Sequence, residues 1–233
     1  MLQVRDLTTH YGTSQALFGM SFDLKAGQVA TLLGRNGMGK TTTIHSIMGI
    51  VKASGGSITF EGEELIGRAS FRTANLGIGL VPEGRQIFPN LTLMENLVAT
   101  ASNHLGIADP WTVDKVFGLF PELETRTSSM GNLLSGGEQQ MLAIGRALMT
   151  NPRLLILDEA TEGLAPLVRQ KIWAALSAIR GAGMSILVVD KNLADLLRIA
   201  DRHFIVQRGQ VVWQGSSLEL QADAEIRAQY LGF

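Results

Sequence analysis

The sequence predicts an α/β fold in which a core of parallel strands carries a small antiparallel β layer and a helical lobe. Three observations lead to this prediction: short strands with turns fill the first third, a helical pattern occupies the middle, and strands alternate with helices afterwards. Such alternation is typical of a parallel sheet covered by helices. The 233 residues fit one large domain, with the helical lobe inserted at about residues 88–150.

The first third is expected to form short strands joined by turns. Strands are expected at residues 2–9, 16–24 and 29–33, followed by a hairpin of residues 57–60 and 64–66. Apolar and polar residues alternate over Leu2–Thr9, whereas Val29–Leu33 is a continuous apolar run, which is typical of a parallel strand buried on both faces. Gly62 marks the turn of the hairpin.

The middle of the chain, from Leu91 to about Met149, has a helical pattern. Thr92 with Glu95, and later Ser135 with Glu138, have the spacing of a capping box, in which a serine or threonine and a glutamate satisfy the free N–H groups at a helix start. Each pair therefore predicts the first turn of a helix.

The last third returns to strand and helix alternation. Strands are expected at residues 154–157 and 185–189, helices at 167–180 and 193–200, and a final hairpin at 204–206 and 211–214. Arg208-Gly209 marks the turn of that hairpin.

Composition excludes several classes of function. The chain has no cysteine, which excludes disulfides, thiolate metal sites and a cysteine nucleophile. Twenty Lys+Arg against 21 Asp+Glu leave a net charge of −1, so no basic footprint indicates nucleic-acid binding. The sequence shows neither a signal-peptide core nor an apolar run long enough to span a bilayer, and we expect a cytoplasmic chain.

The strongest motif is Gly34–Thr41, which matches G-x-x-x-x-G-K-[ST] between an expected strand and an expected helix. Its glycines let successive N–H groups point at phosphates at the positive end of the helix. Lys40 would reach the β- and γ-phosphates, and the Thr41 hydroxyl would bind Mg²⁺. The residues expected to bind ATP here are Gly34, Arg35, Asn36, Gly37, Met38, Gly39, Lys40, Thr41 and Thr42. The alternative is a glycine-rich turn with a chance lysine.

A second motif is the apolar strand that ends in Asp158 and Glu159. A buried strand would deliver Asp158 to the metal, and Glu159, pointing elsewhere, would polarise the attacking water. Without the phosphate loop, a solvated strand end would be the better interpretation of these two carboxylates.

A third motif, Ser135-Gly136-Gly137-Glu138, lies 23 residues before Asp158. Its two glycines leave a helix N-terminus unshielded by side chains, which suits an anion, although a plain helix start is the alternative. The motif resembles the signature of ATP-binding cassette (ABC) ATPases, and the resemblance covers residues 1–233 as one ABC ATPase domain.

The resemblance implies two cassettes that sandwich two nucleotides. Ser135, Gly136 and Gly137 would then contact the γ-phosphate held by a second cassette. It also implies that Tyr11 stacks on adenine, and that Glu162–Ala165 contacts the partner cassette. A core aromatic and a plain loop are the respective alternatives.

Two positions depart from the family pattern. Glu83 stands where most cassettes have a glutamine, and it is expected to offer an oxygen to the metal unless it is an exposed loop carboxylate. Lys191 stands where a histidine usually contacts the γ-phosphate. Lysine donates but cannot accept a hydrogen bond from water, so we expect a slow hydrolyser. The alternative is that Lys191 points to solvent or pairs with Asp190 or Asp195.

Further segments are similar to branched-chain amino-acid importer ATPases of the LivF type, although urea importers share much of the pattern. These segments are residues 81–85, 88–89, 92–96, 136–149, 163–166 and 230–232. Where that subfamily has Glu-Gln-Asn, this chain has Asp190-Lys191-Asn192.

That similarity implies an Mg²⁺-dependent ATPase that powers an importer from the inner face of the cell membrane. Its expected partners are a second cassette, identical or not, two transmembrane permeases docked near residues 83–96, and indirectly a periplasmic binding protein. The alternative from another class is a soluble ABC ATPase or an ATP-binding regulator.

Overall fold

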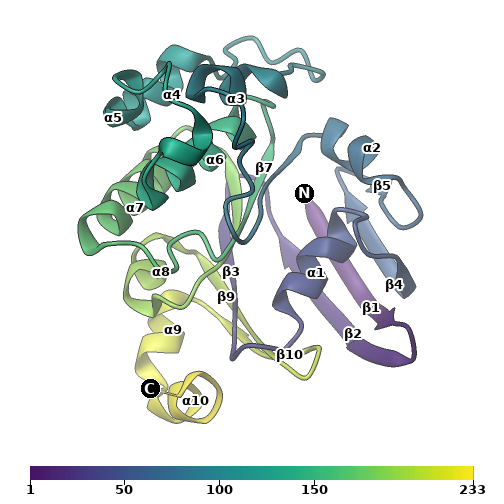
Figure 1. Ribbon diagram of the computed structural model, residues 1–233. Helices are drawn as coiled ribbons and strands as arrows, with labels where there is room; N and C mark the ends of the chain where they lie inside the picture. Colours follow the sequence, from purple (N-terminus) through teal and green to yellow (C-terminus); the bar gives the residue numbers. More distant parts are fainter. Residues whose placement is uncertain (233) are drawn as a thin grey trace.

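The computed structural model describes residues 1–232, which form two β-sheets with helices around them (Figure 1). The four-stranded sheet is antiparallel and has the order β2-β1-β4-β5. The six-stranded sheet has the order β10-β9-β3-β8-β7-β6. Each pair of neighbouring strands in it is parallel, except the antiparallel pair β9 and β10. The strands are β1 (Leu2–Tyr11), β2 (Ser14–Leu24), β3 (Val29–Leu33), β4 (Ala53–Phe60), β5 (Glu63–Glu64), β6 (Ile78–Val81), β7 (Leu154–Asp158), β8 (Ser185–Val189), β9 (Arg202–Gln207) and β10 (Gln210–Gly215).

The helices lie on both sides of the six-stranded sheet. In Figure 1, α1 lies between the two sheets, α6, α7 and α8 lie on the other side, and α3, α4 and α5 form a lobe at the top. The helices are α1 (Lys40–Ile47), α2 (Ser70–Asn75), α3 (Leu93–Ala99), α4 (Val113–Leu119), α5 (Pro121–Glu124), α6 (Gly136–Leu148), α7 (Pro166–Gly181), α8 (Leu193–Ile199), α9 (Ser217–Ala222) and α10 (Ala224–Ile226), with a 3₁₀ helix η1 (Gly131–Leu133) and a π-helix η2 (Arg227–Leu231).

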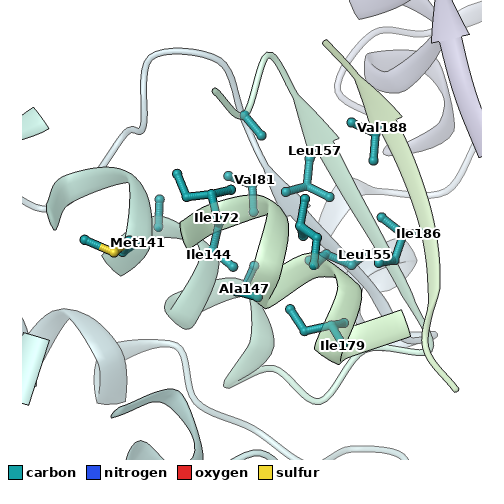
Figure 2. Close-up of a cluster of buried hydrophobic side chains, with 14 of the residues drawn as sticks. Val81, Met141, Ile144, Ala147, Leu155, Leu157, Ile172, Ile179, Ile186 and Val188 are labelled. Atoms are coloured by element: carbon teal, nitrogen blue, oxygen red, sulfur yellow. The ribbon is translucent and has the colours of Figure 1, made fainter. Parts of the chain in front are cut away.

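The central strands are buried on both faces, so their alternate side chains enter two different cores. Leu155 and Leu157 of β7 pack with α6 and α7 (Figure 2), while Leu154 and Ile156 face the side of α1 and the antiparallel sheet. This two-sided burial explains the continuous apolar runs of the sequence.

The predicted fold class is confirmed, together with its antiparallel layer. The strands at residues 29–33 and 185–189 have the predicted bounds, and β9 and β10 form the predicted hairpin. Both predicted capping boxes are present: Thr92 with Glu95 opens α3, and Ser135 with Glu138 opens α6.

Other boundaries differ from the prediction. The stretch from residue 91 to 149 is not continuously helical: residues 100–112 and 125–130 form turns and irregular structure. Gly106 and Pro110 occur in the first of these breaks, where a helix is disfavoured. Strand β6 was not expected, because it has only four residues and includes Gly79, a residue that weakens a strand. A side chain at Gly79 would be crowded, since a Cβ there would lie 3.1 Å from Pro152.

The parallel register places the motif segments at one edge of the sheet. Asp158, the last residue of β7, pairs with Val189, the last residue of β8. The phosphate loop follows β3, and Glu83 follows β6. The carboxyl ends of parallel strands meet at the same edge, where α/β folds bind their ligands.

His203 of β9 is fully buried and connects the sheet to α9. Its Nδ1 lies 2.8 Å from Thr31 Oγ1, and its Nε2 lies 2.9 Å from Ser217 Oγ. Because the Ser217 hydroxyl donates to the Ala200 carbonyl, Nε2 carries the proton and donates to Ser217. Burial lowers the pKa of His203 to about 4 from 6.5, and Asp201 opposes the shift only in part.

We predict that acid weakens the fold through His203. The folded pKa lies below the unfolded one, so this contribution to stability is complete above pH 6.5 and is lost as the pH falls toward 4. At 1.36 kcal/mol per pKa unit, the loss amounts to about 3 kcal/mol. Denaturant unfolding between pH 6.5 and 4 should show a smaller loss in the free energy of unfolding for His203→Gln than for the wild type. The variant His104→Gln, at an exposed position, should behave like the wild type. If the free energy of unfolding of His203→Gln falls with pH as steeply as that of the wild type, the prediction is wrong.

Candidate functional site

The phosphate loop connects β3 to α1 in a conformation that requires glycine. Gly34 has φ 139°, and a Cβ on it would lie 2.3 Å from the Val206 carbonyl oxygen. Gly39, the N-cap of α1, has φ 102°. The first intrahelical bond runs from the Thr43 N–H to the Gly39 carbonyl at 2.9 Å. The N–H groups before Thr43 therefore lie at the open, positive end of the helix, where an anion binds.

Lys40 is buried at the start of α1, with its ammonium held by its own loop. Nζ donates to the Gly34 carbonyl at 2.8 Å and to the Arg35 carbonyl at 2.9 Å. Since an ammonium has three donors, a third hydrogen remains for a phosphate oxygen. Burial lowers the pKa of Lys40, whereas the Asp158 carboxylate raises it.

A cavity of about 340 Å³ brings the motif residues together. It is lined by Ala16, Asn36, Gly37, Gly39, Lys40, Thr41, Thr42, Glu83, Glu159, Glu162 and Lys191. A larger cavity of about 690 Å³ surrounds Gly27, Trp111, Arg153 and Ser185 at the opposite ends of the strands, and no motif residue lines it in the described part of the chain. The smaller cavity is therefore the candidate site.

Asp158 is a buried carboxylate without a hydrogen-bond partner. Its exposed fraction is 1%, and neither oxygen receives a hydrogen bond within residues 1–232. Burial raises the pKa of Asp158 and Glu83 adds to the increase. The Thr41 hydroxyl, which approaches the carboxylate without meeting hydrogen-bond geometry, and the charges of His45 and Lys40 act in the opposite direction. An orphaned buried carboxylate next to a hydroxyl is the environment that a bound cation would satisfy.

These residues alone do not form a complete metal cage. No group of three or more acidic or histidine ligands occurs among residues 1–232. Mg²⁺ commonly binds through one or two carboxylates together with phosphate oxygens and water. Thr41, Asp158 and Glu83 fit that pattern, because they adjoin the cavity that would hold the phosphates.

Glu159 follows Asp158 in a left-handed conformation with φ 54°. Such backbone in a non-glycine residue costs about 1–3 kcal/mol and persists where the surroundings hold it. The Glu159 N–H donates to the Val189 carbonyl at 2.8 Å, which fixes the turn against β8. The turn separates the two carboxylates: Asp158 is buried beneath the cavity, and Glu159 lines it.

Two other predicted nucleotide contacts are Tyr11, beside the phosphate loop, and Met38, within it. Tyr11 is 49% exposed at the end of β1, and its hydroxyl donates to Thr42 Oγ1 at 3.5 Å. This exposure excludes the alternative that Tyr11 is a core aromatic. Met38 is held by the β9–β10 turn, because its carbonyl accepts from the Gly209 N–H at 2.9 Å and its sulfur from the Arg208 N–H at 3.4 Å.

The signature segment does not line the cavity formed by the phosphate loop, as far as residues 1–232 describe it. Ser135 is exposed as the N-cap of α6, where its hydroxyl accepts from the Glu138 N–H at 3.3 Å. A Cβ on Gly136 would lie 2.8 Å from the Arg85 guanidinium, and one on Gly137 would lie 2.8 Å from Val168. The glycines therefore permit close packing of α6 as well as an open helix end.

Lys191 lines the cavity, as expected for the position that usually holds a histidine. Its ammonium pairs with Glu162 Oε1 at 2.5 Å. The expected alternative partners are occupied elsewhere: Asp190 accepts from Thr161 and Asn192, and Asp195 accepts from Asn192 and Arg198. The alternative in which Lys191 pairs with Asp190 or Asp195 is therefore not found: Lys191 pairs with Glu162 of the loop after β7, and its side chain is 51% exposed.

Two features of the site are not predicted from the sequence. Ala16 of β2 lines the cavity, and the Asp190 carboxylate accepts from both the N–H and the hydroxyl of Thr161, at 2.9 and 2.6 Å. The polar residues Thr161 and Asp190 follow two apolar strands in the sequence, and this pattern could have indicated their contact. Nothing in the local sequence indicates that Ala16 lines the cavity.

Comparisons with known proteins agree on one family. The profile of the family described as "ABC transporter" matches residues 17–162. The chain is 41% identical, over the full length of both proteins, to the high-affinity branched-chain amino acid transport ATP-binding protein BraG of Pseudomonas aeruginosa. It is 30% identical to the lipopolysaccharide export system ATP-binding protein LptB of Escherichia coli K12, over 99% of this chain and 97% of LptB.

Solved structures show the same fold. A nucleotide-free ATP-binding cassette from an ABC transporter superposes with a TM-score of 0.84 at 25% identity, over 97% of this chain and 96% of that one. The dimeric post-hydrolysis state of the cassette MJ0796 bound to ADP and Pi superposes with a TM-score of 0.81 at 22% identity, over 93% of this chain and 99% of that one.

We predict that Asp158→Asn stabilises the chain without nucleotide. Removing an unpartnered buried charge should gain about 1–2 kcal/mol, which raises the thermal midpoint by about 2–8 °C in a chain of this size. Calorimetry in EDTA measures the midpoint. Asp109→Asn is the matched control, because the Asp109 side chain is 92% exposed and should gain nothing. A midpoint for Asp158→Asn at or below that of the wild type would contradict the prediction.

Proposed function

Because this chain belongs to the ABC transporter family, we propose that it is the ATPase subunit of an importer for branched-chain amino acids. The resemblance predicted from the sequence is confirmed. ATP hydrolysis coupled to transport is the activity of this family, and its ATPase subunits work with transmembrane permeases. No helix within residues 1–232 combines the length and apolarity needed to cross a bilayer.

One observation carries the choice of substrate: the 41% identity to a branched-chain amino acid transport protein over the full length of both chains. Identity to the lipopolysaccharide export proteins is 30% over a similar length. The higher identity therefore favours amino acids over lipopolysaccharide.

The geometry of the cavity supports hydrolysis by this chain's own residues. The Lys40 ammonium would bind the β- and γ-phosphates with its remaining donor, alongside the N–H groups at the start of α1. Glu159 would accept a hydrogen bond from the attacking water. The water oxygen would then bond to the γ-phosphorus as the bond to the bridging oxygen of ADP breaks, releasing ADP and phosphate.

We propose that hydrolysis depends on Mg²⁺. Thr41 and Asp158 would hold the ion, and Glu83 would add an oxygen at the rim of the cavity. When bound, Mg²⁺ would neutralise part of the phosphate charge. A metal would also offset the cost of the unpartnered Asp158 carboxylate.

The composite site needs a second cassette, identical or not. Ser135, Gly136 and Gly137 lie at an exposed helix N-terminus away from this chain's own phosphate loop. We propose that this end of α6 faces the nucleotide of the partner cassette, with Glu162–Ala165 at the contact. In that arrangement, one chain supplies the phosphate loop and the other supplies the signature segment.

The permeases would dock on the exposed apolar surface beside the loop that carries Glu83. Phe88, Met130 and Leu133 are 40%, 44% and 68% exposed there. Arg146 of α6 donates to the Gln86 carbonyl at 2.7 Å, and its guanidinium lies 4.7 Å from the centre of the Phe88 ring. Force applied at Phe88 would therefore reach α6. Asn96 is buried and would not take part in docking.

We propose that the assembly is peripheral to the inner face of the cell membrane and receives substrate indirectly from a periplasmic binding protein. The family resemblance supports both points. A soluble ABC ATPase and an ATP-binding regulator are disfavoured by the full-length identity to a transport protein.

Transport can be tested in ATP-loaded membrane vesicles that contain this chain, the second cassette and the permeases, with the binding protein added on the outside. We expect ATP-driven uptake of leucine. At ATP concentrations below the dissociation constant, Lys40→Ala should lower the uptake at least about tenfold, since it removes a charge-assisted contact worth about 1.5–3 kcal/mol. The exposed Lys25→Ala serves as the control and should transport normally. Uptake of urea without uptake of leucine would refute the amino-acid assignment.

The two-cassette site can be tested with Glu159→Gln. Without the carboxylate that polarises water, ATP should persist and hold two cassettes together. Analytical ultracentrifugation should show an ATP-dependent dimer, either of this chain alone or mixed with a second cassette. Glu122→Gln, a matched substitution outside the cavity, should show no ATP-dependent dimer beyond that of the wild type. A monomer under every condition, with hydrolysis intact in the wild type, would rule out the composite site.

A further inference from the structure

The ion pair between Lys191 and Glu162 joins two loops at the candidate site. Glu162 follows the strand end that carries Asp158 and Glu159, and Lys191 follows the neighbouring strand β8. Their side chains meet at 2.5 Å, and both line the cavity beside Lys40. Each side chain is about half exposed, at 51% and 49%, so the pair can exchange with other partners.

The backbone of the two loops does not depend on this ion pair. Val189 pairs with Asp158, and its carbonyl accepts from the Glu159 N–H at 2.8 Å. The buried Asp190 carboxylate accepts from the Thr161 N–H at 2.9 Å and from its hydroxyl at 2.6 Å. These inner contacts keep the loops together, so the outer pair can break without unfolding them.

The charges of the cavity explain why Lys191 turns to a carboxylate. Lys191 lowers the pKa of Lys40, whereas Glu162 raises it, so the two ammonium groups repel each other and Glu162 offsets the repulsion. An incoming phosphate chain would supply the same negative charge. Glu162 would then be one of three carboxylates lining the cavity, with Glu83 and Glu159, close to a polyanion.

We propose that Glu162 is a positioning residue that competes with the terminal phosphate of ATP for Lys191. Glu162 holds the Lys191 ammonium while the third phosphate is absent, and releases it when that phosphate arrives. ADP lacks the third phosphate and leaves the ion pair intact. The segment Glu162–Ala165 therefore responds to whether the cavity holds a triphosphate or a diphosphate.

This inference rests on the proposed function, because it takes ATP as the ligand of the cavity. It adds a specific consequence: removing Glu162 strengthens triphosphate binding but not diphosphate binding. A half-exposed pair is worth up to about 1 kcal/mol, which corresponds to about fivefold in affinity. The expected change for Glu162→Gln is therefore a gain of about three- to fivefold in affinity for the triphosphate.

The experiment measures AMP-PNP, a triphosphate that is not hydrolysed, and ADP by titration calorimetry. The variants are Glu162→Gln, Lys191→Gln and the double variant. Glu122→Gln is the matched control, because Glu122 pairs with Lys171 at the same distance of 2.5 Å outside the cavity. Thermal unfolding of each variant checks that the fold is retained.

We expect Glu162→Gln to bind AMP-PNP more tightly with unchanged ADP affinity. Lys191→Gln should weaken AMP-PNP binding alone, and Glu162→Gln should add nothing in the Lys191→Gln background. An equal gain for both nucleotides, or a gain that persists without Lys191, would show a general charge effect and overturn the competition. If the wild type binds ADP and AMP-PNP but Glu162→Gln changes neither, only this inference fails. If the wild type binds neither nucleotide, the proposed function fails as well.

Discussion

The parallel register of β3, β8, β7 and β6 is the constraint on which the candidate site depends. Since these strands run the same way and are buried on both faces, their side chains are mostly apolar, and the charged residues of the site follow at the strand ends. The register sets Asp158 beside Val189, and thereby brings the phosphate loop, two carboxylates and Lys191 to one edge. A shift of one residue in β7 would turn Asp158 toward the other face of the sheet.

The site carries local costs that the rest of the fold offsets. Glu159 has a left-handed backbone, the Asp158 carboxylate is buried without a partner, and burial lowers the pKa of Lys40. Two extensive cores hold these groups in place from both sides of the sheet. Unfavourable backbone and unpaired charge are typical of functional sites, because a ligand can relieve them only when it binds.

Other polar groups have structural roles. Buried His203 links β3, β9 and α9 through neutral hydrogen bonds, and buried Asn96 holds the segment from Phe88 to Thr92 with four hydrogen bonds. Both are fully satisfied, in contrast to Asp158. Asp158 differs from both in that it also adjoins the cavity of the phosphate loop, where a bound cation would supply the missing partner.

The sequence by itself determined the fold class, both capping boxes and the local conformation of the phosphate loop, because periodicity, cap spacing and glycine placement act over a few residues. It also placed Lys40, Asp158 and Glu159 on defined segments. Only the tertiary structure decided that Lys191 pairs with Glu162, that Ala16 lines the cavity and that β6 joins the sheet. Those outcomes depend on contacts between residues far apart in the chain, and the strand register that creates such contacts is not encoded in any short segment.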